Sequence, residues 1–341
     1  MKHAVRWSIY TLALLLILIA IYEIGSRLWR TETYEGDAVL GWRLKPGVKA
    51  TFKMRDANGA AYVAEFATDS LALRTYGSMA SGTTNVLAVG DSFTADQYSG
   101  NQDMWFSVMG SALEGKLGKK FFVGATGGAG YGTYQELLLA QRLAKSFVPD
   151  FFIVQFCAND FFNNHLEWES SGIVASQFYR RPYFTEQGPV YVQGGLATLF
   201  RSPIGRSRFI AKITGIAEGI AYKHYGDYVP TLDRELDDKY QNESILITQK
   251  VLAKLRMVFP SSRAFIVNCS VSTEGTWAPN KAFTEIATSA GFTILERPPL
   301  ALAEGQNRGL VVRHADGGHL NPLGNRIFGE AVAEQLLSAL Q

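Results

Sequence analysis

Three residue types that act together in nucleophilic catalysis occur far apart in this chain. Ser92 follows a short apolar run, residues 85–89, as the last residue of a Gly-Asp-Ser tripeptide. A serine hydroxyl is a nucleophile at neutral pH only when a neighbouring base accepts its proton. His319 is a candidate for that base, and Asp316, separated from it by two glycines, is a candidate to orient the imidazole. The three residues therefore predict a catalytic triad.

Each of these residues also has an alternative interpretation. A Gly-Asp-Ser tripeptide after a strand can simply cap a helix, and a histidine in a loop is often only solvated. His314, close to His319 in the sequence, is a second candidate for the base. The catalytic interpretation therefore requires the hydroxyl and the imidazole to meet in the fold.

Acyl transfer also needs hydrogen-bond donors for the negative charge that develops on the carbonyl oxygen. Asn159 follows the apolar run 151–156, which is the strongest buried-strand pattern in the chain. Residues 124–133 are rich in glycine, and a glycine can turn its backbone amide inward because no Cβ obstructs it. We select the backbone amides of Gly130 and Ser92 and the side chain of Asn159 as candidate oxyanion-hole donors. The alternative for Asn159 is that it caps a turn.

Alternating strands and helices are predicted from residue 84 onward. The predicted strands span residues 85–89, 120–123, 151–156, 264–269 and 292–295. The predicted helices span residues 104–117, 134–147, 244–259, 281–290 and 323–340. This alternation is typical of a parallel sheet, in which ligands bind beyond the carboxyl ends of the strands. Two runs before it, 49–54 and 61–66, flank an Asn-Gly pair and predict a hairpin.

Composition argues against several function classes. The net charge is +2 and no basic stripe carries interleaved aromatic residues, so nucleic acid is not expected as a partner. No cluster of histidines, cysteines and carboxylates indicates a metal site, and no cofactor is expected. Cys157 and Cys269 are expected to be two buried thiols, and a single bridge between neighbouring strand ends is the alternative.

A glycine pattern provides the strongest rival hypothesis. Gly124, Gly127 and Gly130 follow a predicted strand with a spacing similar to that of nucleotide-binding short-chain dehydrogenases. However, the pattern follows the second strand of the sheet, and no acidic residue ends another strand about 20 residues later to hold a ribose. A Tyr-x-x-x-Lys pair on a suitable helix is also missing, so nicotinamide chemistry is the less favoured interpretation.

The four segments, in their order, resemble the SGNH (GDSL-type) hydrolase family. Ser92 stands in its Gly-Asp-Ser block, Gly130 in its glycine block, Asn159 in its Asn-Asp block, and Asp316 with His319 in its Asp-x-x-His block. The Gly-Trp pair at 41–42 and the Leu-Arg pair at 73–74 are similar to membrane-anchored bacterial members.

Two departures from the family pattern stand out. Cys157 replaces the glycine that the family usually has two positions before its asparagine, and the glycine block is unusually rich in glycine. The resemblance implies a three-layer α/β/α fold with a five-stranded parallel sheet in flavodoxin-like order. It also implies ester hydrolysis or acyl transfer through an acyl-serine.

The N-terminal segment carries no charge from Trp7 to Tyr22 and follows Lys2 and Arg6. Extended to Leu28, it reaches the roughly 20 residues that a membrane span requires. A cleaved signal peptide is the alternative, but no small-x-small cleavage site follows the apolar core. We expect a single-pass inner-membrane anchor, with the remaining chain in the periplasm or otherwise outside the cytoplasm.

Together these observations predict a membrane-anchored serine esterase that removes acyl groups, acetyl above all, from carbohydrate or other envelope esters. The alternatives are an O-acyltransferase acting on a polysaccharide and a catalytically silent scaffold in polysaccharide assembly. The Asp-x-x-His spacing resembles hydrolytic family members more than the Asp-x-His of alginate-type acetyltransferases. The expected organisation is an anchor at 1–30, a lead-in with a hairpin at 31–83, and a hydrolase domain at 84–341 with an insertion at about 162–242.

Overall fold

A six-stranded sheet forms the centre of the computed structural model, which describes residues 2–29, 31–95, 97–171, 181–191, 209, 234–269 and 278–340. The strand order is β12 (Thr293–Leu295), β11 (Arg263–Asn268), β8 (Phe151–Phe156), β6 (Thr84–Gly90), β7 (Phe121–Gly127) and β5 (Arg74–Tyr76). The first five strands are parallel, in the flavodoxin-like order that was predicted. β7 and β8 are buried at every residue, as expected for central strands of a parallel sheet.

The sixth strand, β5, is antiparallel to β7 and was not predicted. It is only three residues long, and Arg74 interrupts any apolar pattern. The Arg74 guanidinium is nevertheless buried, because it donates to the backbone carbonyl of Ser99 and to the side chain of Asn101. These partners lie distant in the sequence, so the short strand had no local signal.

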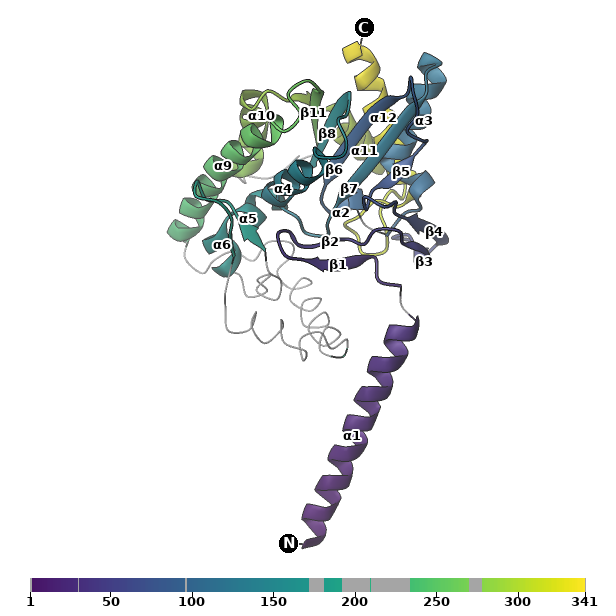
Figure 1. Cartoon of the computed structure of the whole chain (residues 1–341), viewed down its shortest axis with the longest axis vertical. Helices are drawn as coiled ribbons and strands as arrows, with labels where there is room; N and C mark the ends of the chain where they lie inside the picture. The colour runs from purple at the N-terminus through teal and green to yellow at the C-terminus, as the bar shows by residue number, and fades with distance from the viewer. Residues whose placement is uncertain are drawn as a thin grey trace.

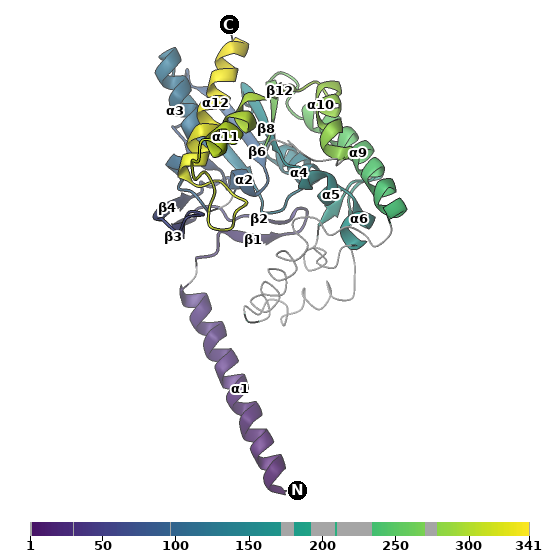
Figure 2. The ribbon, with the colours of Figure 1, turned by 180° about the vertical axis from the view of Figure 1, so that it is seen from behind.

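Helices cover both faces of the sheet (Figure 1, and from behind in Figure 2). One layer contains α4 (Thr133–Leu143), α5 (Asn159–Asn164), α9 (Arg234–Arg256) and α10 (Ala278–Ser289). The other contains α3 (Trp105–Leu117), α11 (Arg297–Asn307) and α12 (Pro322–Leu340). Successive residues of β6 point to opposite layers, since Leu87 packs with the first and Val86 with the second. The predicted three-layer α/β/α architecture is therefore confirmed.

Two helices differ from the predictions more than the others do. α9 begins at Arg234 rather than at residue 244, so part of the expected insertion belongs to a core helix. α11 was not predicted, because two adjacent prolines obscured its pattern. Pro298 and Pro299 lie in its first turn, where the missing N–H groups cost little.

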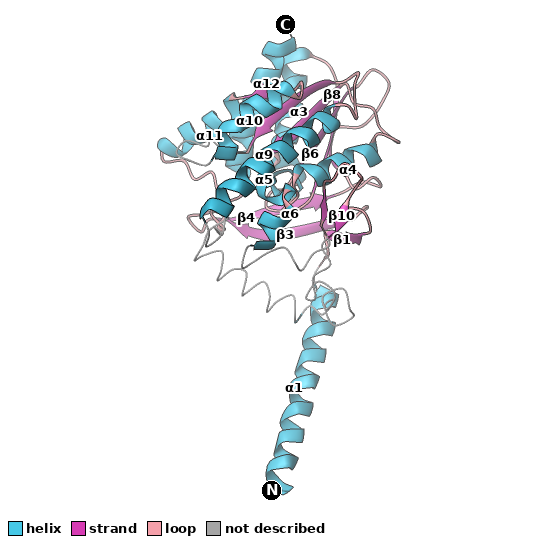
Figure 3. Ribbon diagram, turned by 90° about the vertical axis from the view of Figure 1, so that its left-hand side faces the viewer, coloured by secondary structure: helices cyan, strands magenta, loops and turns pink. Residues whose placement is uncertain are grey.

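The lead-in forms two hairpins, β1 (Tyr34–Asp37) with β2 (Gly41–Leu44), and β3 (Lys49–Arg55) with β4 (Ala61–Ala67). The second hairpin confirms the Asn-Gly prediction, and Gly59 adopts a φ of +86° in its turn. Figure 3 shows the β3–β4 hairpin at the end of the body from which α1 (Lys2–Trp29) projects.

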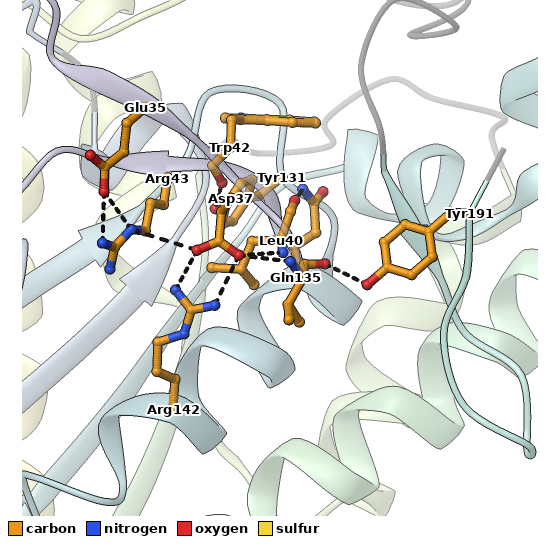
Figure 4. Close-up of polar contacts among 10 residues, drawn as sticks. Glu35, Asp37, Leu40, Trp42, Arg43, Tyr131, Gln135, Arg142 and Tyr191 are labelled. Atoms are coloured by element: carbon orange, nitrogen blue, oxygen red, sulfur yellow. Dashed lines mark hydrogen bonds and ion pairs between the residues drawn. The ribbon is translucent and has the colours of Figure 1, made fainter. Parts of the chain in front are cut away.

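The first hairpin docks on the α4 layer (Figure 4). Asp37 accepts two hydrogen bonds from the Arg142 guanidinium, at 2.7 and 2.9 Å. The turn at residues 39–40 also accepts hydrogen bonds, from the Gln135 side chain at 2.8 Å and from the Tyr191 hydroxyl at 2.9 Å. Tyr191 belongs to a short hairpin of β9 (Pro182–Tyr183) and β10 (Val190–Tyr191) within the expected insertion. The lead-in thus contacts both α4 and the insertion.

The sequence also predicts a helix around residues 208–222, which lies outside the described residues apart from Phe209. α1 contains a 22-residue apolar stretch, Val5–Ser26, that is long enough to cross a membrane. A signal sequence would have the same length and composition, so α1 could be either.

The expectation of two buried thiols was wrong, because Cys157 and Cys269 form a disulfide. β8 and β11 are neighbouring parallel strands, and Phe156 is paired with Asn268 at their ends. The next residue of each strand is therefore a cysteine facing the other, with their Cα atoms 5.2 Å apart. The choice between thiols and a bridge depended on which strands were neighbours.

Candidate active site

Ser92 begins a single helical turn, α2 (Ser92–Ala95), beyond the end of β6. Asp91 organises this turn, since its side chain accepts the N–H of Phe93 at 2.9 Å and its carbonyl accepts the N–H of Ala95 at 3.0 Å. Both interpretations of the Gly-Asp-Ser tripeptide are thus compatible with the structure. Asp91 caps a helix, and the cap sets Ser92 at the carboxyl edge of the sheet.

The imidazole of His319 joins Ser92 to Asp316. Its Nε2 atom lies 2.8 Å from Oγ of Ser92, and its Nδ1 atom lies 2.6 Å from Oδ2 of Asp316. Donation of the Nδ1 proton to Asp316 leaves the Nε2 lone pair directed at the serine hydroxyl. The structure therefore brings the three residues into the order hydroxyl, imidazole, carboxylate.

A tight loop holds the Asp316 carboxylate in place. Its Oδ1 atom accepts the backbone N–H groups of Gly318 at 3.0 Å and of His319 at 3.1 Å, and Gly317 adopts a φ of +78°. Burial raises the pKa of Asp316, but the hydrogen bonds from the imidazole and the backbone outweigh it and hold the pKa well below its usual range. The carboxylate is therefore ionised at neutral pH.

Aromatic rings enclose the His319 imidazole, a feature that the sequence analysis missed. Tyr98 stacks on it with ring centroids 4.3 Å apart, and the Phe93 ring lies 5.2 Å away. The competing base, His314, packs on Tyr98 and accepts the backbone N–H of Asp316 at 3.2 Å. Thus His319 faces Ser92, whereas His314 supports the loop.

The β3–β4 hairpin also supports this loop through backbone hydrogen bonds. The N–H of Ala57 donates to the carbonyl of Arg313 at 3.0 Å, and the N–H of Ala315 donates to the carbonyl of Arg55 at 2.9 Å. Burial, with the nearby negative charges of Asp316 and Asp56, raises the pKa of Tyr62 to about 12. No local pattern in the lead-in indicated this contact.

The register of three parallel strands aligns the remaining candidates with Ser92. Gly90 at the end of β6 pairs with Gly127 on β7 and with Gln155 on β8. Gly130 follows β7 and adopts a φ of +66°, while Asn159 begins α5 just after β8. The Nδ2 atom of Asn159 donates to Oδ1 of Asn163 at 3.0 Å.

The glycine pattern has a packing explanation. Gly124 and Gly127 lie within β7 rather than in a loop, which corrects the predicted segment. A Cβ atom on Gly127 would lie 1.8 Å from the carbonyl oxygen of Gly90, and one on Gly124 would lie 2.9 Å from Leu73. Gly127 allows the close approach of β6 and β7, and Gly124 leaves room for the Leu73 side chain, so their spacing does not form the turn of a nucleotide-binding loop.

Two buried carboxyl groups lie on the helices that follow β7 and β8, Glu136 on α4 and Asp160 on α5. Burial, together with the charges of Asp160 and Asp91, raises the pKa of Glu136 well above its usual value. The pKa of Asp160 is raised by burial and by Asp91 in the same way.

Among the described residues, no group of histidine, cysteine and carboxylate side chains is arranged to hold a metal ion.

The sequence matches a family model described as GDSL-like lipase/acylhydrolase over residues 86–332. None of the curated proteins matches this chain. Similar solved structures include a lipolytic G-D-S-L family protein from Veillonella parvula, with 11% identity, a TM-score of 0.41, and coverage of 74% of this chain and 97% of that chain.

Two further solved structures are similar. The psychrotrophic esterase EstA from a Pseudoalteromonas species has 9% identity and a TM-score of 0.42, with 75% of this chain and 98% of that chain covered. An acetyl xylan esterase has 14% identity and a TM-score of 0.40, with 75% and 100% covered. The family model matches well over half of the sequence, from β6 into α12, and on that ground the chain belongs to the GDSL-like lipase/acylhydrolase family.

Proposed function

We propose that this protein is a serine esterase that hydrolyses carboxylic esters through an acyl-serine. Ser92 is the nucleophile, His319 the general base and then the general acid, and Asp316 the group that orients the imidazole. The observation that carries the proposal is the position of His319 Nε2, 2.8 Å from Oγ of Ser92, with Nδ1 against Asp316.

The reaction follows from these positions in two steps. Oγ of Ser92 attacks the ester carbonyl while its proton passes to Nε2 of His319, which then protonates the departing alkoxide. A water molecule next attacks the acyl-serine, and His319 takes its proton and returns one to Ser92. Asp316 stabilises the imidazolium that exists between these transfers.

The oxyanion of each tetrahedral intermediate is assigned to the amides of Ser92 and Gly130 and to the side chain of Asn159. Gly130 adopts a left-handed backbone conformation, in which its N–H group points in a different direction from that of an extended residue. The Asn159 side-chain amide has two N–H bonds, of which one donates to Asn163. The second is the donor that we assign to the substrate oxygen.

The proposed location of the catalytic domain suggests its substrate class. We assign residues 1–30 to an uncleaved membrane anchor, 31–83 to a lead-in, and 84–341 to the hydrolase domain with an insertion at about 162–242. The apolar stretch Val5–Ser26 supports the anchor. A catalytic domain held outside the cytoplasm meets envelope carbohydrate, so acetyl esters of such carbohydrate are the proposed substrates.

Labelling with a fluorophosphonate tests the proposal on the full-length protein in detergent. We expect the wild type to be labelled and Ser92→Ala not to be. Ser338→Ala, which changes an exposed serine on α12, serves as the matched control and should be labelled like the wild type. Absence of label on the folded wild type would contradict the proposal and favour a silent scaffold.

Acetate release from an acetylated polysaccharide then identifies the acceptor. Release in buffer that disappears in Ser92→Ala indicates hydrolysis, with water as acceptor. Acetyl transfer to an added sugar without net release of acetate would instead indicate an O-acyltransferase.

A further inference from the structure

A buried chain of polar side chains runs from Asn159 into the insertion. Nδ2 of Asn159 donates to Oδ1 of Asn163 at 3.0 Å, and Nδ2 of Asn163 donates to Oε1 of Glu169 at 3.1 Å. The other oxygen of Glu169 accepts the Tyr183 hydroxyl at 2.5 Å and faces Nε of Arg181 at 2.9 Å. We call the last four residues, Asn163, Glu169, Arg181 and Tyr183, the Glu169 network.

Burial makes the geometry of this network restrictive. Asn163 is 9% exposed, and Glu169, Arg181 and Tyr183 are 2–4% exposed. A buried charge is tolerated only when it is paired and hydrogen-bonded, so neither Glu169 nor Arg181 can turn away without a large loss. The network therefore holds one arrangement of donors and acceptors.

The carboxylate sets the direction of both asparagine amides. Glu169 faces the Arg181 guanidinium and accepts the Tyr183 hydroxyl, so it acts as an acceptor and Asn163 must present its NH₂ group to it. The carbonyl oxygen of Asn163 then faces Asn159, which must present its own NH₂ group in turn. If the Asn159 amide were flipped, a carbonyl oxygen would occupy the position of its nitrogen.

The same arginine also lies against the loop that carries Gly130. Nη1 of Arg181 donates to Oε1 of Gln135, which also accepts the backbone N–H of Gly132 at 3.4 Å. Nη2 of Arg181 lies 3.9 Å from the position that a Cβ atom on Gly130 would occupy. The guanidinium also sits 5.1 Å from the centre of the Trp42 ring. Arg181 thus joins the Asn159 side of the site to the Gly130 side.

We propose that the Glu169 network positions the oxyanion hole, by fixing the amide nitrogen of Asn159 and supporting the Gly130 loop. This inference rests on the proposed esterase function. Asn163, Glu169, Arg181 and Tyr183 are positioning residues in this scheme, because they act on the substrate only through Asn159 and Gly130. Glu169, Arg181 and Tyr183 of the insertion consequently support the catalytic site.

Two variants separate positioning from ordinary structural support. Asn163→Ala removes the link to Asn159 and leaves the Glu169–Arg181 ion pair in place. Glu169→Gln replaces the acceptor by a group that also donates, which permits both asparagine amides to reverse. Because a misplaced donor affects the transition state more than substrate binding, each should lower kcat roughly ten- to a hundredfold with KM within about twofold.

A double-mutant cycle with Asn159→Ala provides the decisive readout. In p-nitrophenyl acetate hydrolysis by the full-length protein in detergent, Asn159→Ala alone should lower kcat on the order of a hundredfold. Adding Asn163→Ala to it should cause little further loss, because the positioned amide is already gone. Glu304→Gln, which makes the same acid-to-amide change in the exposed Arg297–Glu304 ion pair on α11, should leave kcat unchanged.

The results distinguish the possible failures. A wild-type kcat in Asn163→Ala would overturn the positioning role. So would a double variant in which the kcat losses of Asn163→Ala and Asn159→Ala multiply. In both cases the esterase function stands. If Glu169→Gln does not fold, the Asn163→Ala cycle decides. A wild type that neither reacts with fluorophosphonate nor hydrolyses the ester would instead contradict the proposed function and this inference with it.

Discussion

The Asp316 carboxylate is hydrogen-bonded to its own loop as well as to His319. Its carboxylate accepts two backbone N–H groups and lies 2.6 Å from the imidazole nitrogen. An amide at this position could keep some of these contacts but could not stabilise an imidazolium. Asp316→Asn should therefore lower kcat on the order of 10⁴-fold, whereas Asp56→Asn in the neighbouring turn should retain most activity. Steady-state hydrolysis of p-nitrophenyl acetate measures both, and a small loss in Asp316→Asn would remove it from the triad.

The lowered pKa of Asp316 also predicts a pH dependence of stability. The folded-state pKa lies below the ordinary value of 3.8, so the ionised carboxylate stabilises the folded state above that pH. This stabilisation is lost as the pH falls through 3.8 toward the folded-state pKa. Urea unfolding of wild type and Asp316→Asn should therefore show a stability difference at pH 5–7 that shrinks below about pH 4. A difference that grows on acidification would contradict this sign.

Among the elements, the close approach of β6 and β7 depends on one glycine. A Cβ atom on Gly127 would lie 1.8 Å from the backbone oxygen of Gly90, and backbone cannot move aside cheaply. Gly127→Ala should therefore destabilise the protein strongly, by about 3 kcal/mol or more, and disturb the edge that carries Ser92. Gly115→Ala on α3, where a Cβ atom meets nothing within 4 Å, should be neutral or stabilising by up to about 1 kcal/mol. Urea unfolding of both variants tests the difference.

The disulfide joins two strands at the same edge. Cys157 and Cys269 are 112 residues apart. On the chain-entropy model, a bridge that closes a loop of that size stabilises the folded state by about 4–5 kcal/mol. Replacing both cysteines by serine should lower the urea midpoint, and added reductant should lower that of the wild type similarly. Neither thiol belongs to the proposed triad, so the folded variant should still react with fluorophosphonate. An unchanged midpoint under reductant would indicate that the bridge does not form.

At the scale of the whole molecule, the proposed membrane location depends on α1. Its apolar stretch Val5–Ser26 has large side chains that are mostly exposed, for example Leu14 at 57% and Ile17 at 55%. Such a surface is stable in lipid and unfavourable in water. The full-length protein should therefore remain in the membrane fraction after alkaline carbonate extraction. Its intact mass should include α1, and a mature chain that begins after this helix would instead identify a signal sequence.

Much of the fold was accessible from local patterns. Fully apolar runs such as Phe151–Phe156 can be buried on both faces only in a central strand, so they indicated the parallel sheet directly. The predicted helix at 323–340 corresponds to α12, which begins one residue earlier at Pro322 because proline suits the first turn of a helix. β5 and α11 were missed because a three-residue strand and a helix that begins with two prolines have no such pattern.

The strand order was implied by the family resemblance. By itself, the sequence determined the parallel sheet, the second lead-in hairpin, and the set of residues with suitable chemistry. These depend on side-chain type and short-range spacing. Only the tertiary structure decided that His319 rather than His314 faces Ser92, that Cys157 pairs with Cys269, and that Glu169 connects to Asn159. Each of these depends on strand register and on packing between distant segments, which no local spacing encodes.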